Sequence, residues 1–117
     1  MNIQRYGVTR RYSSMVAHHH TIYLVEVPTN LNADITAQTE NLLANIEQQL
    51  TQAGSDKSRL LMVTIYLADM ADYDAMNITW ENWLPAGTAP VRACLQAKLS
   101  SMKYRIEIVL TAAVGQN

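Results

Sequence analysis

The chain has 117 residues, of which 49% are apolar and only 16% are charged. This length suffices for one domain with a single core, and the high apolar content predicts a surface that is buried against other copies of the chain. Nine basic and ten acidic residues give a formal net charge of −1, which excludes an extended basic surface for a nucleic-acid backbone. The sequence has neither a signal-peptide pattern nor a membrane-length apolar run, and a single cysteine excludes an intrachain disulfide. We therefore expect one cytoplasmic domain, residues 1–117, that does not bind membranes.

Two runs rich in β-forming residues, 11–17 and 21–27, flank the triplet His18-His19-His20. This arrangement predicts a hairpin with a polar turn. Neighbouring side chains of a strand point to opposite faces, so three consecutive histidines do not converge easily on one ion. The pattern favours a solvated turn, and we expect no metal site.

Apolar residues recur at steps of three and four from Ile35 to Ala53, which predicts an amphipathic helix of about five turns. Asn32 or Asp34 can cap its start, and Gly54 supplies a stop. The predicted solvent face consists of polar residues (Gln38, Glu40, Asn41, Glu47, Gln48 and Gln52).

Residues 60–67 are almost continuously apolar, as in a central strand that is covered on both faces. Asp69 or Asp72 then caps a second helix, and residues 85–88 end it. One stripe of this helix is apolar or aromatic (Tyr73, Met76, Trp80, Trp83 and Leu84), and its two tryptophans are typical of core packing.

Residues 89–97 and 104–110 alternate with the two-residue period of β-strands. The predicted order is β-β-α-β-α-β-β, an α+β fold with a mixed β-sheet and two helices packed on one face. The other face of the sheet would be bare, which predicts burial in a symmetric oligomer.

The charged side chain in the middle of a strand, Arg92, is the strongest candidate for a functional residue, because its planar fork matches a carboxylate. An ion pair with Glu107 or with a neighbouring subunit is the alternative. Glu107 itself could orient or deprotonate a water, or it could form a structural salt bridge. We expect Arg92 and Glu107 on adjacent strands, sharing one face of the sheet.

Three further polar residues are candidates for the site. Cys94 lacks an adjacent base, so its thiol is expected to be structural while its backbone groups remain available to a ligand. Tyr12 and Asn77 are polar residues beside apolar neighbours, and by themselves they are not distinctive.

The segments Ala-Pro-Val-Arg-Ala-Cys-Leu at 89–95 and Lys-Tyr-Arg-Ile-Glu-Ile-Val-Leu-Thr-Ala at 103–112 resemble the RidA (YjgF) family of enamine/imine deaminases. Other landmarks follow the family's order: Tyr12-Ser13, a long helix ending at Gly54, residues 67–70, and Asn77 followed by Trp80. The resemblance extends over almost the whole chain.

The resemblance implies a chorismate-mutase-like fold and a homotrimer with sites between subunits. It also implies hydrolysis of reactive 2-imino acids, such as those derived from 2-aminoacrylate, without a cofactor or a metal. Arg92 would hold the substrate carboxylate and Glu107 would position the attacking water. Cys94 would contribute through its backbone, and Tyr12 and Asn77 would line the cleft.

One position departs from the family pattern. Many members have a Ser-Gly step after the second strand, where this chain has Val25-Glu26. A carboxylate at this lip of the pocket would weaken the binding of an anionic substrate. Glu26 could thus narrow the substrate range or mark a different ligand.

Two functions follow as hypotheses. The leading one is an imine deaminase, and the alternative is a trimeric module that binds a small carboxylate without turnover. Ribonuclease activity, which is associated with some members of the family, is disfavoured by the near-neutral charge and by the lack of a His/Lys catalytic pair.

Overall fold

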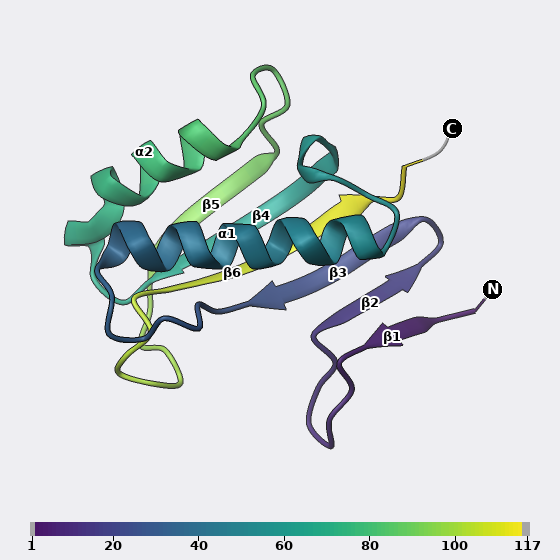
Figure 1. The fold of residues 1–117 in the computed structure, drawn as a ribbon, viewed down its shortest axis with the longest axis horizontal. Coiled ribbons are helices and arrows are strands. Elements are labelled where there is room, and N and C mark those ends of the chain that lie inside the picture. Colours follow the sequence, from purple (N-terminus) through teal and green to yellow (C-terminus); the bar gives the residue numbers. More distant parts are fainter. Residues whose placement is uncertain (1, 116–117) are drawn as a thin grey trace.

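The computed structural model describes residues 2–115 as one six-stranded sheet with both long helices on the same face (Figure 1). The strands are β1 (Gln4–Tyr6), β2 (Met15–His18), β3 (Thr21–Glu26), β4 (Leu60–Leu67), β5 (Val91–Gln96) and β6 (Ile106–Ala113). The helices are α1 (Ile35–Gln52) and α2 (Tyr73–Trp83), with single 3-10 turns at Lys57–Arg59 and Met70–Asp72. This confirms the predicted α+β class, to which the structure adds the short edge strand β1.

The strand order across the sheet is β1-β2-β3-β6-β4-β5. Every neighbouring pair is antiparallel except β4 and β5, which run parallel because α2 crosses over between them. Strand β4 lies inside the sheet as predicted, but β6 is inserted between β3 and β4. As a result β5 is an edge strand and does not pair with β6.

The core lies between the sheet and the helices. Helix α1 begins at the predicted cap, where the Asp34 carboxylate accepts a hydrogen bond from the Ala37 backbone N–H at 2.9 Å. It ends before Gly54, which adopts a φ of 83°. The core side chains of α1 pack on the inward residues of β3, β4 and β6 (Leu42, Leu43, Ile46, Leu50, Ile22, Leu24, Val63, Ile65, Leu67, Ile106 and Ile108).

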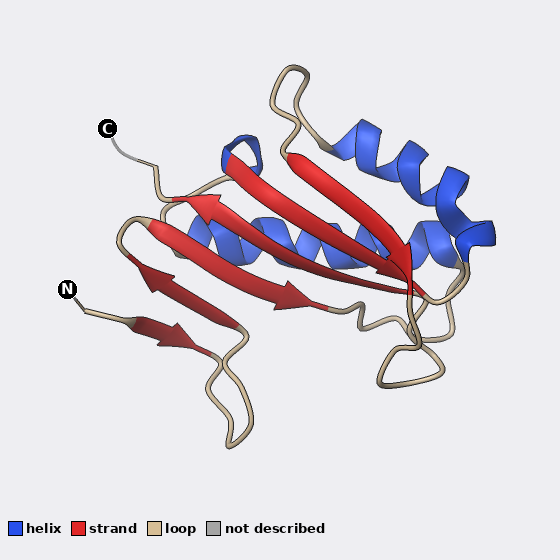
Figure 2. Ribbon diagram, turned by 180° about the vertical axis from the view of Figure 1, so that it is seen from behind, coloured by secondary structure: helices blue, strands red, loops and turns tan. Residues whose placement is uncertain are grey.

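The opposite face of the sheet carries no helix, as Figure 2 shows from behind. Several large apolar side chains are exposed there: Tyr23, Val25, Met62, Val91 and Leu95. Within a single chain, β4 is therefore covered on one of its two faces. The prediction that both faces of β4 are covered is wrong for the isolated chain.

Three local predictions need correction. Residues 11–14 form a loop instead of a strand, and the hairpin turn consists of His19 and His20 alone, because His18 pairs with Thr21. Gln38, expected on the solvent face of α1, is fully buried. Asp72 makes no side-chain cap at the start of α2, whereas Asp69 caps the 3-10 turn before it.

Candidate functional site

Arg92 projects from the edge strand β5 toward the helices. It pairs in register with Val63 of β4, whose side chain is fully buried in the core between sheet and helices. Residues in register on adjacent strands share a face, so Arg92 also lies on the helix side. The alternation predicted for residues 91–96 is confirmed, since Val91 and Leu95 are exposed on the other face.

The guanidinium of Arg92 packs against aromatic rings instead of a carboxylate. Its central carbon lies 5.8 Å from the ring centroid of Trp80 and 5.9 Å from that of Tyr73, and Nη2 donates to the Tyr73 hydroxyl at 3.4 Å. The ion pairs within residues 2–115 involve other side chains. The aromatic contacts hold the guanidinium in place by cation–π attraction and leave its charge available to an anion.

Arg92 opens onto a cavity of about 470 Å³ between β5, α2 and the loop that joins them. Asn77 lines this cavity from α2, together with Tyr73, Trp80 and Glu81. The structure thus brings Arg92 and Asn77 together at one cavity. We call this cavity the arginine cavity.

Cys94 follows Arg92 on the same face of β5 but does not line the arginine cavity. Burial raises the pKa of its thiol, and the nearby positive charge of Arg92 acts in the opposite direction. A partly buried thiol with a raised pKa is a poor nucleophile, and the structural role of the Cys94 sulfur stays a prediction.

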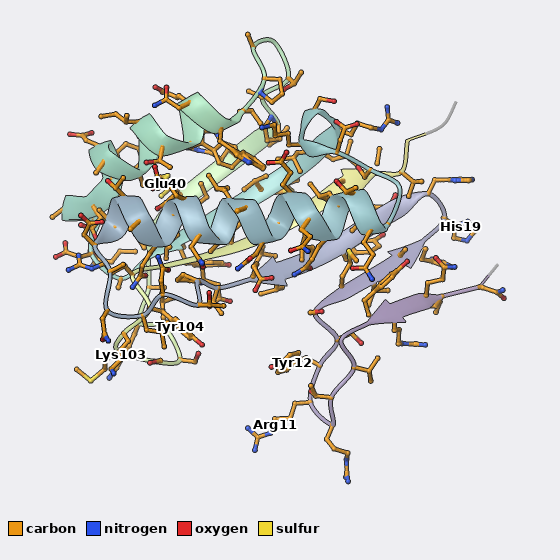
Figure 3. The ribbon with its side chains drawn as sticks, viewed as in Figure 1. Arg11, Tyr12, His19, Glu40, Lys103 and Tyr104 are labelled. Atoms are coloured by element: carbon orange, nitrogen blue, oxygen red, sulfur yellow. The ribbon has the colours of Figure 1, made fainter. Side chains whose placement is uncertain are left out.

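Glu107 lies on the other face of the sheet. It pairs with Tyr66 of β4 and alternates with the buried Ile106 and Ile108. It lines a second cavity, of about 450 Å³, which we call the glutamate cavity. Two loops bound this cavity: the β1–β2 loop with Tyr12 and the loop before β6 with Tyr104. Figure 3 shows Tyr12 and Tyr104, which mark these two loops, along the lower edge of the molecule.

Glu26 also lines the glutamate cavity, at the end of β3. Its carboxylate accepts hydrogen bonds from the Val27 backbone N–H at 3.1 Å and from the side-chain amide of Gln49 on α1. Burial raises the pKa of Glu26, and the two hydrogen bonds lower it to a smaller extent. The structure therefore places Tyr12, Glu26 and Glu107 together at the glutamate cavity. Arg92 and Asn77 lie together at the separate arginine cavity.

The prediction that Arg92 and Glu107 lie on adjacent strands and share a face is wrong. Strand β4 separates them, and they project from opposite faces of the sheet. An ion pair between them within one chain is excluded for the same reason. Apart from Cys94, five residues were expected at one site. In a single chain they form two separate groups, one at the arginine cavity and one at the glutamate cavity.

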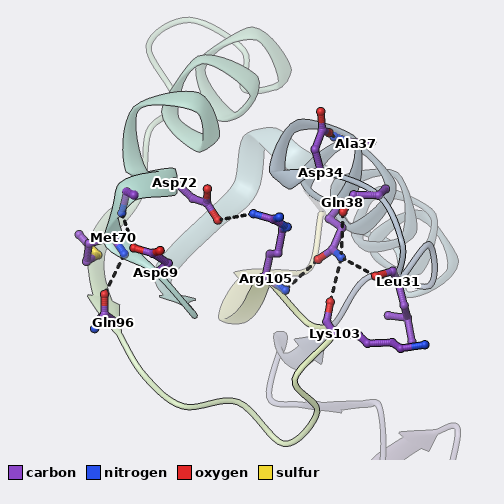
Figure 4. A network of polar contacts seen from close by, with 12 residues as sticks. Leu31, Asp34, Ala37, Gln38, Asp69, Met70, Asp72, Gln96, Lys103 and Arg105 are labelled. Carbon is purple, nitrogen blue, oxygen red and sulfur yellow. Dashed lines mark hydrogen bonds and ion pairs between the residues drawn. The ribbon is translucent and has the colours of Figure 1, made fainter.

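A buried glutamine holds the loop that precedes Glu107. The Gln38 side-chain amide donates to the backbone carbonyls of Lys103, Leu31 and Ala33 at 3.0, 3.3 and 3.4 Å, and its oxygen accepts from the Arg105 backbone N–H at 2.9 Å (Figure 4). The Arg105 side chain pairs with Asp72 at 3.3 Å. These contacts fix the start of β6, and with it the positions of Tyr104 and Glu107.

Sequence reasoning missed several residues of the two cavities. Tyr73 and Trp80 were assigned to helix packing alone, although Trp80 both packs in the core and contacts Arg92. Ser100 occurs in a segment without a motif, Tyr104 was expected to begin a strand but precedes β6, and nothing in the sequence links Gln49 to Glu26. In residues 2–115 no group of three or more His, Cys, Asp or Glu side chains is arranged to hold a metal ion, and no helix is both long and apolar enough to cross a membrane.

The comparisons with known proteins agree on one family. Residues 2–114 match the family described as endoribonuclease L-PSP. The chain is 47% identical over 114 residues to the RutC family protein YoaB of Escherichia coli, covering 97% of this chain and 100% of that protein. A crystal structure of a YjgF-family protein from Neisseria meningitidis superposes with a TM-score of 0.94 at 41% identity, covering 100% of this chain and 98% of that one. A chloroplastic protein of Arabidopsis thaliana named Reactive Intermediate Deaminase A is 31% identical over 84 residues, which are 72% of this chain and 44% of that protein.

Proposed function

Because the chain belongs to the endoribonuclease L-PSP family, which is the YjgF/RidA family of its relatives, we propose that it hydrolyses reactive 2-imino acids to 2-oxo acids and ammonia. The observation that carries the proposal is the guanidinium of Arg92, which faces the arginine cavity and forms no ion pair within residues 2–115, although Glu81 lines the same cavity. The name of the Arabidopsis relative supports the same class of reaction.

Arg92 binds the substrate carboxylate in this proposal. The guanidinium offers two parallel N–H groups, and Tyr73 and Trp80 restrict its motion before the substrate arrives. Asn77, on the wall of the same cavity, offers an amide to the substrate. A fixed carboxylate orients the neighbouring imine carbon, and such orientation is a large part of what this reaction needs.

Glu107 acts on the water. A protonated imine carbon is already electrophilic, so a carboxylate that orients a water and takes one of its protons is sufficient for the attack. The new C–O bond gives a tetrahedral intermediate bearing an amino group. Glu107 then gives the proton to that nitrogen, the C–N bond breaks to release ammonia, and the hydroxyl proton returns to Glu107 as the C=O bond of the 2-oxo acid forms. The atoms balance with water as the only co-reactant.

The site is proposed to form between subunits of a homotrimer. A single chain keeps Arg92 and Glu107 on opposite faces of its sheet, whereas the glutamate cavity of one chain can meet the arginine cavity of the next. A ring of three chains lets each copy contribute both halves. The exposed apolar side chains of the bare face, among them Val25 and Leu95, would be buried in this assembly.

The test is a coupled assay in which a pyridoxal-phosphate dehydratase generates the imino acid from serine or threonine. We expect the wild-type protein to accelerate formation of the 2-oxo acid and Arg92→Ala to abolish the acceleration. Arg5→Ala, which removes an exposed arginine of β1, is the matched control and should retain full activity. Absence of acceleration by the wild type, or equal acceleration by Arg92→Ala, would overturn the proposal.

A second candidate is a trimeric module that binds a small carboxylate without turnover. The extra carboxylate of Glu26 in the glutamate cavity favours it, because a negative charge near an anionic substrate opposes binding and can alter which ligand is accepted. Thermal stabilisation by 2-oxo acids in the absence of any acceleration in the coupled assay would support this candidate over the deaminase.

A further inference from the structure

Glu26 introduces a second carboxylate into the glutamate cavity. It is the last residue of β3, and its side chain leaves the strand on the helix side, as those of Ile22 and Leu24 do. Glu107 lies on the neighbouring strand β6, one residue before Ile108, which pairs with Glu26. The two carboxylates thus approach the cavity from opposite faces at the end of the sheet.

The position of the Glu26 carboxylate is fixed by its hydrogen bonds. One oxygen accepts from the Val27 backbone N–H at 3.1 Å, and the other accepts from the amide nitrogen of Gln49. The amide oxygen of Gln49 is buried and has no hydrogen-bond partner. If the Gln49 amide were turned around, its oxygen would face the oxygen of the Glu26 carboxylate. Glu26 therefore determines the orientation of the Gln49 amide. The side chain of Glu26 is therefore held at the wall of the cavity.

The charges around the glutamate cavity have one sign. Besides Glu26 and Glu107, its described lining consists of uncharged residues (Tyr12, Ser13, Ser14, Val25, Val27, Ser100 and Tyr104). A partly enclosed space bounded by two carboxylates has a negative potential, which attracts cations and repels anions. The positive charge needed for a substrate carboxylate is provided by Arg92, in the other cavity.

We propose that Glu26 is a specificity-determining residue that selects 2-imino and 2-oxo acids with a cationic or hydrogen-bond-donating side chain and rejects those with a second carboxylate. Gln49 is its positioning residue. The inference rests on the proposed function, in which the α-carboxylate of the ligand binds Arg92. The rest of the ligand then extends toward the glutamate cavity, where its side chain meets Glu26.

The test measures binding of three 2-oxo acids by calorimetry at pH 8. The probes are 2-oxo-5-guanidinopentanoate, 2-oxohexanoate and 2-oxoglutarate, with a cationic, a neutral and an anionic side chain. We expect the wild type to bind the guanidino acid most tightly and 2-oxoglutarate least tightly. Glu26→Gln keeps the size of the side chain and an acceptor for Gln49, and should reduce the ratio of the two extreme affinities about tenfold.

Glu40→Gln is the matched control, because it removes a carboxylate from the exposed side of α1 and should leave the ratio unchanged. An unchanged ratio in Glu26→Gln overturns the inference and leaves the proposed function standing. A wild type that binds 2-oxoglutarate as tightly as the guanidino acid overturns the inference without any variant. Binding of none of the three acids by the wild type also overturns the inference, whereas the proposed function stands or falls with the coupled assay.

Discussion

Arg92 and Glu107 project from opposite faces of one sheet, with strand β4 between them. Arg92 pairs with Val63 of β4 on the helix face, and Glu107 pairs with Tyr66 of the same strand on the bare face. Each residue has its own cavity. Because adjacent positions of a strand alternate between faces, no rearrangement of side chains within one chain brings the two groups to one small ligand.

The first prediction is that two inactive variants complement each other. If each site combines Glu107 of one chain with Arg92 of the next, Arg92→Ala and Glu107→Gln are both inactive alone. In trimers reassembled at random from an equal mixture, about a quarter of the sites combine an intact Glu107 with an intact Arg92. We expect the coupled assay to recover about a quarter of the wild-type activity. A mixture as inactive as its components would argue against a site shared between chains.

The second prediction concerns Cys94. Burial raises the pKa of its thiol, and the side chain does not line the arginine cavity, so its sulfur has no step to perform. We expect Cys94→Ala to retain kcat within about threefold of the wild type, whereas Arg92→Ala loses at least about a hundredfold. Loss of activity in a folded Cys94→Ala protein would show that the thiol takes part in the reaction.

Local patterns were sufficient to predict α1, the interior strand β4 and the two faces of β5. In each of these the spacing of apolar residues and the flanking turn formers act within a few residues. The strand order was not predictable in this way. Consecutive strands often pair, which suggested that β5 and β6 are neighbours, but β6 inserts between β3 and β4 instead. This non-local pairing of β6 with β3 and β4 separates Arg92 from Glu107.

Gln38 shows a second limit of sequence reasoning. Its polarity indicated a solvent-facing position on α1, yet it is fully buried. Its partners are backbone groups of Leu31 and Ala33 and of Lys103 and Arg105, of which the last two lie 65 and 67 positions away in the chain. Backbone groups of a loop look the same in every sequence, so nothing local indicates that a glutamine will satisfy them.

The third prediction follows from these contacts. Gln38→Leu removes the hydrogen bonds between the fully buried Gln38 side chain and backbone groups of Lys103 and Arg105, and we expect a loss of about 1 to 3 kcal/mol in the free energy of unfolding. Urea denaturation measures the change. Gln48→Leu, on the exposed side of the same helix, should change stability by less than about 0.5 kcal/mol. Equal effects of the two substitutions would mean that the hydrogen bonds of Gln38 contribute nothing net.

The fourth prediction concerns the hairpin turn between β2 and β3. His19 and His20 both have positive φ, 51° and 63°, a backbone conformation that glycine and asparagine adopt at lower cost than most other residues. Replacing the pair by Asn-Gly suits this turn and should stabilise the protein by about 1 kcal/mol in thermal or urea unfolding. The double substitution to alanine keeps the strain and should leave stability almost unchanged. Stabilisation by alanine to the same degree would assign the effect to the loss of the imidazoles.

The fifth prediction is a dependence of stability on pH that originates at Glu26. Burial raises its pKa in the folded protein above the ordinary value of 4.5, so between the two pKa values the folded state holds more protons than the unfolded state. In that interval the stability contributed by this group falls as pH rises. Glu26→Gln removes the titration, and its amide can donate to the buried, unpartnered oxygen of Gln49.

We therefore expect Glu26→Gln to be more stable than the wild type at pH 7, by about 1 kcal/mol or about 4 °C in Tm, and to lose part of this advantage at pH 4. Scanning calorimetry at both pH values measures the difference. Glu40→Gln, whose carboxylate is exposed on α1, should show the same small difference at both. An advantage of Glu26→Gln that is larger at pH 4 than at pH 7 would mean that the hydrogen bonds from Val27 and Gln49 outweigh burial, because they stabilise the ionised carboxylate.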